Sequence, residues 1–240
     1  MKPEQCQQML DDLNQEMDQL LYAISHDLRA PLRAIDGFSQ AVLEDYGDTL
    51  DEVGKDFLSR VRGGGKKVNA YIEGLLHMSR ETRGDLNPEL VNLTTLIEEA
   101  HANLTNEHYD HAPLLTVTKN VSVSMDRRLA RTMLSKLLDN AWKFTANVKK
   151  PAIEFGSMDI DGKPTCFMRD NGIGFDMHFA KDRLFGAFQR MHDDNGYEGL
   201  GTGLATARRI ISRHGGQIWA ESQPYEGTTI YFRVSAGERE

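Results

Sequence analysis

Two glycine-rich stretches in the C-terminal third of the chain have the composition of a phosphate-binding site. The first is D-N-G-I-G-F-D at residues 170–176, and the second is G-L-G-T-G-L-A at residues 199–205. Glycine lets the backbone approach a ligand closely, and the second stretch opens onto an apolar helical pattern whose N-terminus could bind phosphate. Either stretch alone is more typical of a tight surface turn. Their pairing, with Asp170 leading the first, predicts a nucleotide site.

His26 is a candidate nucleophile. It lies roughly 200° around the predicted helix from the apolar positions, so we expect it to face water. A neutral imidazole is nucleophilic near pH 7, and Asp27 could orient it and accept its proton. Arg29 and Arg33 follow on the same face and could hold added phosphate charge. On residue types alone, a solvated helix face that contains one histidine is the better interpretation.

Two long helices are expected to carry this histidine. Apolar residues recur at steps of three and four over residues 10–42 and again over 57–76, a pattern typical of helices that pack against a partner. D-Y-G-D at 45–48 predicts the turn between them, and the run Gly63–Gly65 predicts a locally soft helix. Because two such helices cannot bury their stripes alone, we expect a homodimeric four-helix bundle with two-fold symmetry. The stripes are Leu10, Leu13, Met17, Leu20, Ile24, Leu28, Leu32, Ile35 and Val42, then Phe57, Val61, Val68, Ile72, Leu75 and Leu76.

The rest of the chain alternates predicted strands and helices. Thr94 and Asp126 are possible N-caps of two amphipathic helices, and a third helix is expected at 203–214. Residues 177–198 should form a mobile lid. This pattern predicts an α/β sandwich with helices on one face of a single sheet, and an α+β class for the whole chain. The expected strands are 91–93, one or two within 114–124, 153–160, 165–169, 218–222 and 228–234.

Composition excludes several function classes. The net charge of −8 argues against nucleic-acid binding as the main task. No apolar run could span a bilayer and the first residues lack a signal-peptide core, so we expect no direct membrane insertion. Cys6 and Cys166 fit free thiols in a reducing compartment, the cytoplasm. His108 and His111 have no cysteine partners and do not predict a metal site.

Six segments, in order, resemble the bacterial sensor histidine kinases, most closely the phytochrome-like and PAS-linked kinases. A-I-S-H-D-L-R-A-P-L-R-A-I-D-G-F-S resembles their phospho-accepting segment, and L-L-D-N-A-W-K-F-T their asparagine box. D-N-G-I-G-F-D and G-L-G-T-G-L-A resemble the two glycine boxes. L-F-G-A-F-Q-R resembles the phenylalanine box, and G-T-T-I-Y-F the closing strand. The resemblance covers nearly the whole chain.

The resemblance implies a role for each matching residue. His26 would take the γ-phosphoryl group of ATP, with Asp27 as general base and Arg190 reaching the γ-phosphate. Asn140 would coordinate Mg²⁺, and Lys143 would contact phosphate. The remaining nucleotide-binding residues would be Phe144 and Asp170 at the adenine, Gly172 and Gly174 in the wall beside it, and Gly199, Gly201, Gly203 and Leu204 around the phosphates. Such positioning and charge neutralisation are what phosphoryl transfer requires.

Three positions depart from the family pattern. Lys136 stands where a first asparagine is usual; a cation can touch phosphate but cannot ligate Mg²⁺, so the metal site would be weaker. Phe144 replaces a common tyrosine and loses its hydroxyl. Ala30 stands four residues after His26, where relatives that dephosphorylate their partner usually have threonine or asparagine, so we expect weak phosphatase activity.

The resemblance implies a helical hairpin at 1–84, a linker at 85–90 and, at 91–236, an ATP-binding domain of the histidine kinase, gyrase and chaperone type. The chain would phosphorylate His26 and pass the phosphoryl group to an aspartate of a response regulator, under an upstream sensor module or a separate sensor chain. One alternative is an ATPase that couples hydrolysis to dimer closure, as in type II topoisomerases, mismatch-repair proteins or the heat-shock chaperone; the hairpin with His26 speaks against it. The other is a non-catalytic dimeric signalling scaffold with a weakened Mg-ATP site.

Overall fold

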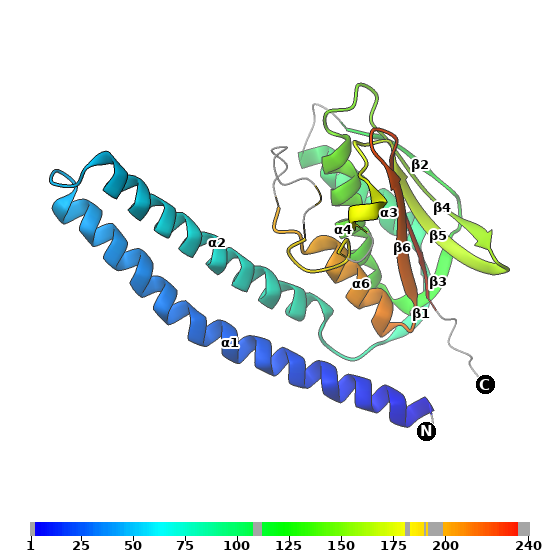
Figure 1. Ribbon diagram of the computed structural model, residues 1–240. Helices are drawn as coiled ribbons and strands as arrows, with labels where there is room; N and C mark the ends of the chain where they lie inside the picture. The colour runs from blue at the N-terminus through cyan, green and yellow to red at the C-terminus, as the bar shows by residue number, and fades with distance from the viewer. Residues whose placement is uncertain (1–2, 108–111, 181–182, 190, 192–198, 235–240) are drawn as a thin grey trace. The chain divides into compact units, whose positions relative to one another are not determined.

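The structure, a computed structural model, divides into two compact units (Figure 1). One unit extends to Arg80 and the other begins at Glu81. Among the helices described, none is long and apolar enough to cross a membrane. The described residues are 3–107, 112–180, 183–189, 191 and 199–234.

The first unit is a helical hairpin of α1 (Pro3–Tyr46) and most of α2 (Glu52–Thr82). The turn lies where the sequence predicts it. The Tyr46 carbonyl accepts a hydrogen bond from the Leu50 N–H at 3.1 Å. The Asp51 carboxylate accepts one from the third residue after it at 2.7 Å, which satisfies a backbone donor in the first turn of α2.

Two ion pairs join the facing sides of the hairpin. Arg62 Nε lies 2.9 Å from Asp36 Oδ1, and Arg29 Nη2 lies 2.9 Å from Glu73 Oε1. In this structure the Arg29 guanidinium is thus paired with Glu73, and the expectation that it would serve phosphate beside His26 stays a prediction. Residues three apart on a helix differ by about 60° in direction, which is enough to turn the Arg29 guanidinium toward α2.

Among the members of the apolar stripe of α1 whose side chains are described, all but the half-buried Leu32 are exposed. Its members Leu20, Ile24, Leu28, Ile35 and Val42 are 37–54% exposed. The side chains that α1 buries include two small serines, at positions 25 and 39. A single chain therefore leaves exposed the apolar residues that, from the sequence pattern, were expected to pack against a partner. On α2, the stripe members Phe57, Val61 and Val68 are exposed as well, whereas Ile72 and Leu76 are buried.

Helix α2 continues unbroken through the run Gly63–Gly65. A Cβ atom added at any of the three positions would meet nothing within 4 Å. Packing among the described residues therefore does not require glycine there. The sequence-based expectation of a locally soft helix stays a prediction.

The second unit contains two sheets rather than the single sheet expected. The smaller pairs β1 (Pro88–Asn92) with β3 (Ser122–Asp126) in antiparallel register. Strand β1 thus starts inside the predicted linker, because its partner lies more than thirty residues downstream and leaves no local signal. The larger sheet has the order β2-β4-β5-β7-β6, with β2 and β4 parallel and the other neighbours antiparallel. Its strands are β2 (Leu114–Val117), β4 (Ala152–Ile160), β5 (Lys163–Asp170), β6 (Gln217–Gln223) and β7 (Gly227–Arg233).

Three longer helices cover one face of the larger sheet (Figure 1), and a short helix, α5, precedes the second glycine stretch. Asp126 caps α4 as predicted, because its Oδ1 accepts from the Leu129 N–H at 3.0 Å. Thr94, the other predicted cap, lies inside α3. Asn92 accepts from the first-turn N–H at 3.2 Å instead, and the Thr94 hydroxyl donates to a neighbouring loop carbonyl. The helices are α3 (Leu93–Glu107), α4 (Arg127–Thr145), α5 (Met177–Ala180) and α6 (Gly203–Arg213).

Helix α4 is the central core element of this unit. Its apolar residues Leu129, Met133, Leu134, Leu137 and Leu138 are all at most 2% exposed, as the helical period predicts. They pack with α3, α6 and the inner faces of β4, β5 and β7. This packing fixes the rotation of α4, and therefore which way its remaining side chains point near its C-terminal end.

Two arginines hold the segment that leads into this unit. The four successive carbonyl oxygens of residues 81–84 each accept a hydrogen bond from a guanidinium group. Arg128 donates to the first and third at 2.9 and 2.8 Å, and Arg213 donates to the second and fourth. These bonds satisfy carbonyls that the end of a helix leaves without partners.

Candidate functional site

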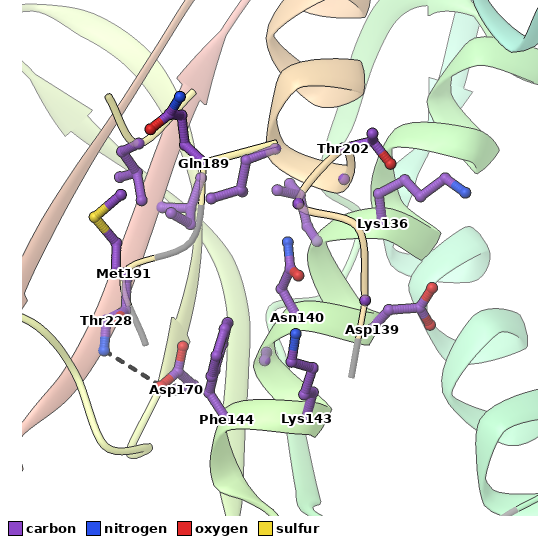
Figure 2. Close-up of a pocket in the computed structure, with 18 of the residues that line it drawn as sticks. Lys136, Asp139, Asn140, Lys143, Phe144, Asp170, Gln189, Met191, Thr202 and Thr228 are labelled. Atoms are coloured by element: carbon purple, nitrogen blue, oxygen red, sulfur yellow. Dashed lines mark hydrogen bonds between the residues drawn. The ribbon is translucent and has the colours of Figure 1, made fainter. Parts of the chain in front are cut away.

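A pocket opens between α4, strands β5 and β7, and the start of α6 (Figure 2). Asp170, Met191 and Thr228 lie on one side of it, and the polar side chains of α4, Lys136, Asp139 and Asn140, lie on the other, beside the start of α6 (Figure 2). Such a cavity with a few converging polar groups is typical of a small-molecule site. Its lining includes Lys136, Asp139, Asn140, Lys143 and Phe144 from α4; Met168 and Asp170 from β5; Phe175, Leu184, Gln189, Met191 and residues 199–204; and Thr228 and Ile230 from β7.

Asp170 is the buried acid of the pocket. Its Oδ1 accepts from the Gly172 N–H at 2.8 Å and from the Thr228 N–H at 3.3 Å (Figure 2). Burial raises the pKa of Asp170 to about 6, although these two backbone bonds act in the opposite direction. In the described part of the chain both bonds use the same oxygen, so Oδ2 is left as an acceptor for a ligand.

The polar end of the pocket is built where α6 begins. Thr202, at the N-cap of α6, makes no side-chain bond to the first turn. A Cβ atom at Gly203 would lie 3.3 Å from Asn140 Nδ2, and one at Gly199 would lie 3.5 Å from Lys143 Nζ. The N-terminus of a helix therefore meets an amide and a cation, an arrangement that suits an anion. Lys143 also lies over the Phe144 ring, 4.8 Å from its centre.

Gly172 and Gly174 are part of the wall but do not line the pocket. A Cβ atom at Gly172 would lie 2.6 Å from the Phe144 carbonyl oxygen. Gly174 has a φ of +55°, and a Cβ atom there would lie 1.9 Å from the Gln223 carbonyl oxygen. These two glycines therefore let the loop pack against neighbouring backbone, and they shape the wall without lining the pocket.

The predicted nucleophile lies in the other unit. The His26 side chain is 76% exposed, as its helical position predicts, and Asp27 is 82% exposed beside it. His26 Nδ1 lies 3.2 Å from Asp27 Oδ1. A bond from Nδ1–H to this carboxylate would select the tautomer whose Nε2 lone pair faces solvent.

Several residues proposed from sequence for the nucleotide meet in this one pocket, namely Asn140, Lys143, Phe144, Asp170, Gly199, Gly201, Gly203 and Leu204. Arg190, His108, His111 and part of the predicted lid, residues 181–182, 190 and 192–198, lie outside the described residues. Sequence reasoning missed the lining residues Asp139, Met168, Phe175, Leu184, Gln189, Met191, Thr202, Thr228 and Ile230. A signal existed for Thr228, because it lies in the closing strand that pairs with β5, opposite Asp170.

Known protein families match both parts of the chain, in the order of the two units. Residues 16–84 match the His Kinase A (phospho-acceptor) domain. Residues 125–238 match the histidine kinase-, DNA gyrase B- and HSP90-like ATPase. The chain carries the catalytic core of a sensor histidine kinase. This result confirms the resemblance drawn from the motifs, and also the expected fold of a helical hairpin followed by an α/β ATPase domain.

Curated relatives of this histidine kinase core include two cyanobacterial phytochromes of a Nostoc species. It is 35% identical over 229 residues to cyanobacterial phytochrome B of a Nostoc species, which is 94% of this chain and 30% of the relative. It is 33% identical over 222 residues to the methanogenesis regulatory histidine kinase FilI of Methanothrix harundinacea, covering 92% of this chain and 25% of that protein. The histidine kinase core thus spans less than a third of the length of these relatives.

Solved histidine kinases share the fold of this core. Full-length ShkA, crystallised in complex with AMPPNP, aligns over 91% of this chain and 47% of its own, with a TM-score of 0.56 and 20% identity. Acinetobacter baumannii AdeS aligns over 89% of this chain and 98% of its own, with a TM-score of 0.54 and 21% identity.

Proposed function

We propose that this chain uses ATP to phosphorylate His26 and passes the phosphoryl group to an aspartate of a response regulator. The observation that carries the proposal is the occurrence, in one chain, of a pocket suited to an adenine nucleotide and a water-exposed histidine paired with a carboxylate. In the proposed pocket, Asp170 Oδ2 accepts from the adenine amino group and the start of α6 receives the phosphates.

The transfer step follows from the His26–Asp27 geometry. Nε2 attacks the γ-phosphorus, the Nε2–P bond forms, and the bond from phosphorus to the leaving ADP oxygen breaks. The ring then carries a positive charge, which Asp27 stabilises before taking the Nδ1 proton as general base. Arg190 would neutralise charge on the γ-phosphate.

Mg²⁺ fits this pocket only together with the nucleotide. Among the described residues, no group of three His, Cys, Asp or Glu side chains lies close enough to hold a metal. Mg²⁺ commonly binds one or two protein oxygens and completes its shell with phosphate and water, and Asn140 offers one amide oxygen. Asn140 would therefore hold the ion against the phosphates, where the ion neutralises their charge.

The exposed stripe of α1 supports a homodimer, with two hairpins forming a four-helix bundle. Further partners would be the receiver domain of the regulator and an upstream sensor module or separate sensor chain. We place the chain in the cytoplasm, where ATP is available and free thiols persist. The scaffold alternative is favoured by Lys136, which removes a possible metal ligand from the pocket. It predicts nucleotide binding and dimerisation without phosphorylation.

The test of the proposed function is incubation of the wild-type dimer with γ-labelled ATP and Mg²⁺. A phosphohistidine survives alkali and is lost in acid, so label with that stability supports the proposal. Subsequent addition of a phosphorylatable receiver domain should move the label to an aspartate of that partner. Nucleotide binding without any label would instead establish the scaffold alternative.

Nucleotide affinity should fall as the pH drops through about 6. The pKa of Asp170 is raised to about 6, so protonation below that pH removes the negative acceptor, and affinity should decrease by up to about tenfold per pH unit. Calorimetric titration with adenosine between pH 5 and 8 measures this effect without a phosphate that itself titrates. Constant affinity from pH 5 to 7 would contradict the assignment of Asp170.

Dephosphorylation of the regulator should be slow because Ala30 has no group that can hold a water molecule. Ala30 is exposed, four residues after His26. We expect Ala30→Thr to accelerate the loss of phosphate from the regulator by at least about tenfold, by positioning a water. The measurement is decay of the labelled regulator with each variant. A wild-type chain that is already as fast as Ala30→Thr would refute the expectation.

A further inference from the structure

Lys136 lines the pocket, but its ammonium group is paired with a carboxylate outside the lining. It lies one turn before Asn140 on α4, and its Cβ is 3.8 Å from the position a Cβ would take at Gly203. Its stem is therefore beside the start of α6. Its amine points away from Asp170 in Figure 2 and forms an ion pair with Glu81, with Nζ 3.2 Å from Oε1.

The partner carboxylate is not part of the pocket lining. Both side chains are partly exposed, 28% for Lys136 and 22% for Glu81. Water therefore screens the two charges, and the ion pair is weak. A lysine has a flexible stem and three donors, and can change partners by rotation about its side-chain bonds. Phosphate groups at the start of α6 would carry several negative charges within reach of that stem.

We propose that Lys136 exchanges partners: its ammonium group leaves Glu81 and binds the phosphate oxygens of a nucleoside di- or triphosphate. The inference rests on the proposed function, because it assumes that the pocket binds such a nucleotide. Asn140 offers a single amide oxygen to a metal at this end of the pocket. The ammonium group of Lys136 would therefore neutralise phosphate charge even when no metal is bound. Glu81 competes with the phosphates for the same ammonium group.

The test compares equilibrium affinities for ADP and adenosine, with EDTA and with saturating Mg²⁺. Lys136→Met keeps the stem and removes the charge. It should weaken ADP binding in EDTA by about ten- to hundredfold, weaken it less in Mg²⁺, and leave adenosine unchanged. Lys136→Arg should retain ADP binding, because it keeps the charge.

Glu81→Gln, alone and combined with Lys136→Met, completes a double-mutant cycle. Removing the competitor should tighten ADP binding several-fold in the Lys136 background and have no effect in the Lys136→Met background. Equal ADP affinity in wild type and Lys136→Met, or a Glu81→Gln effect that persists without Lys136, would overturn the proposal. Adenosine binding distinguishes failure of this proposal from failure of the proposed function. A wild-type chain that binds neither adenosine nor ADP refutes the proposed function itself.

Discussion

Replacing His26 with glutamine should reduce labelling of the chain from γ-labelled ATP to background. Glutamine keeps a polar side chain of similar length on an exposed helix face, so folding and dimerisation should persist. It has no nitrogen lone pair that can attack phosphorus, because the amide nitrogen is delocalised. The loss should therefore be complete rather than partial, with nucleotide affinity unchanged.

His77→Gln is the matched control, because His77 is also an exposed histidine, on α2 of the same hairpin. It should label as wild type does. Label that survives in His26→Gln would place the phosphoryl group on another residue. Loss of label in both variants would show that the measurement reports the hairpin as a whole rather than one nucleophile.

Replacing Asp170 with asparagine should weaken ATP binding on the order of a hundredfold and change the preferred base. Two backbone N–H groups donate to Oδ1, so the asparagine must keep its oxygen there and present its NH₂ group where Oδ2 was. That donor then faces the adenine amino group, another donor, and a buried pair of unsatisfied donors is costly. Hypoxanthine carries an oxygen at the same place, so ITP should bind this variant better than ATP.

Competition binding with ATP and ITP against both proteins measures the switch. Asp176→Asn removes the same charge from the same loop, at an exposed residue outside the pocket lining, and should keep the preference for ATP. The variant should stay folded, because burial raises the pKa of Asp170 to about 6 and the charge of this residue therefore opposes folding at neutral pH. An Asp170→Asn variant that still prefers ATP would remove Asp170 from the adenine site.

The features predicted correctly from sequence are those set by local periodicity. The exposure of His26, the buried face of α4 and the cap at Asp126 each depend on residues within a few turns of one helix. The features missed depend on pairings between distant segments. Thr228 reaches Asp170 across 58 positions, and Arg29 reaches Glu73 across 44. Neither distance can be read from the spacing of residue types.

The same distinction explains the glycines. Sequence alone grouped Gly172 and Gly174 with Gly201 as nucleotide-binding residues, because all three belong to similar motifs. Only Gly201 lines the pocket, while the first two pack against backbone from α4 and the β6–β7 turn. The motifs therefore indicated the region of the candidate site, and the packing of the loops was needed to separate the residues that line the pocket from those that support it.

The two arginines that bind the carbonyls of residues 81–84 limit how domains of different proteins can be joined at this segment. Because Arg128 and Arg213 contact main-chain oxygens, the side chains of this segment can drift during evolution without loss of the attachment. Its length cannot, since one inserted residue would shift every carbonyl relative to its donor. Chimeric receptors joined within this segment should therefore tolerate changes of sequence far better than changes of length.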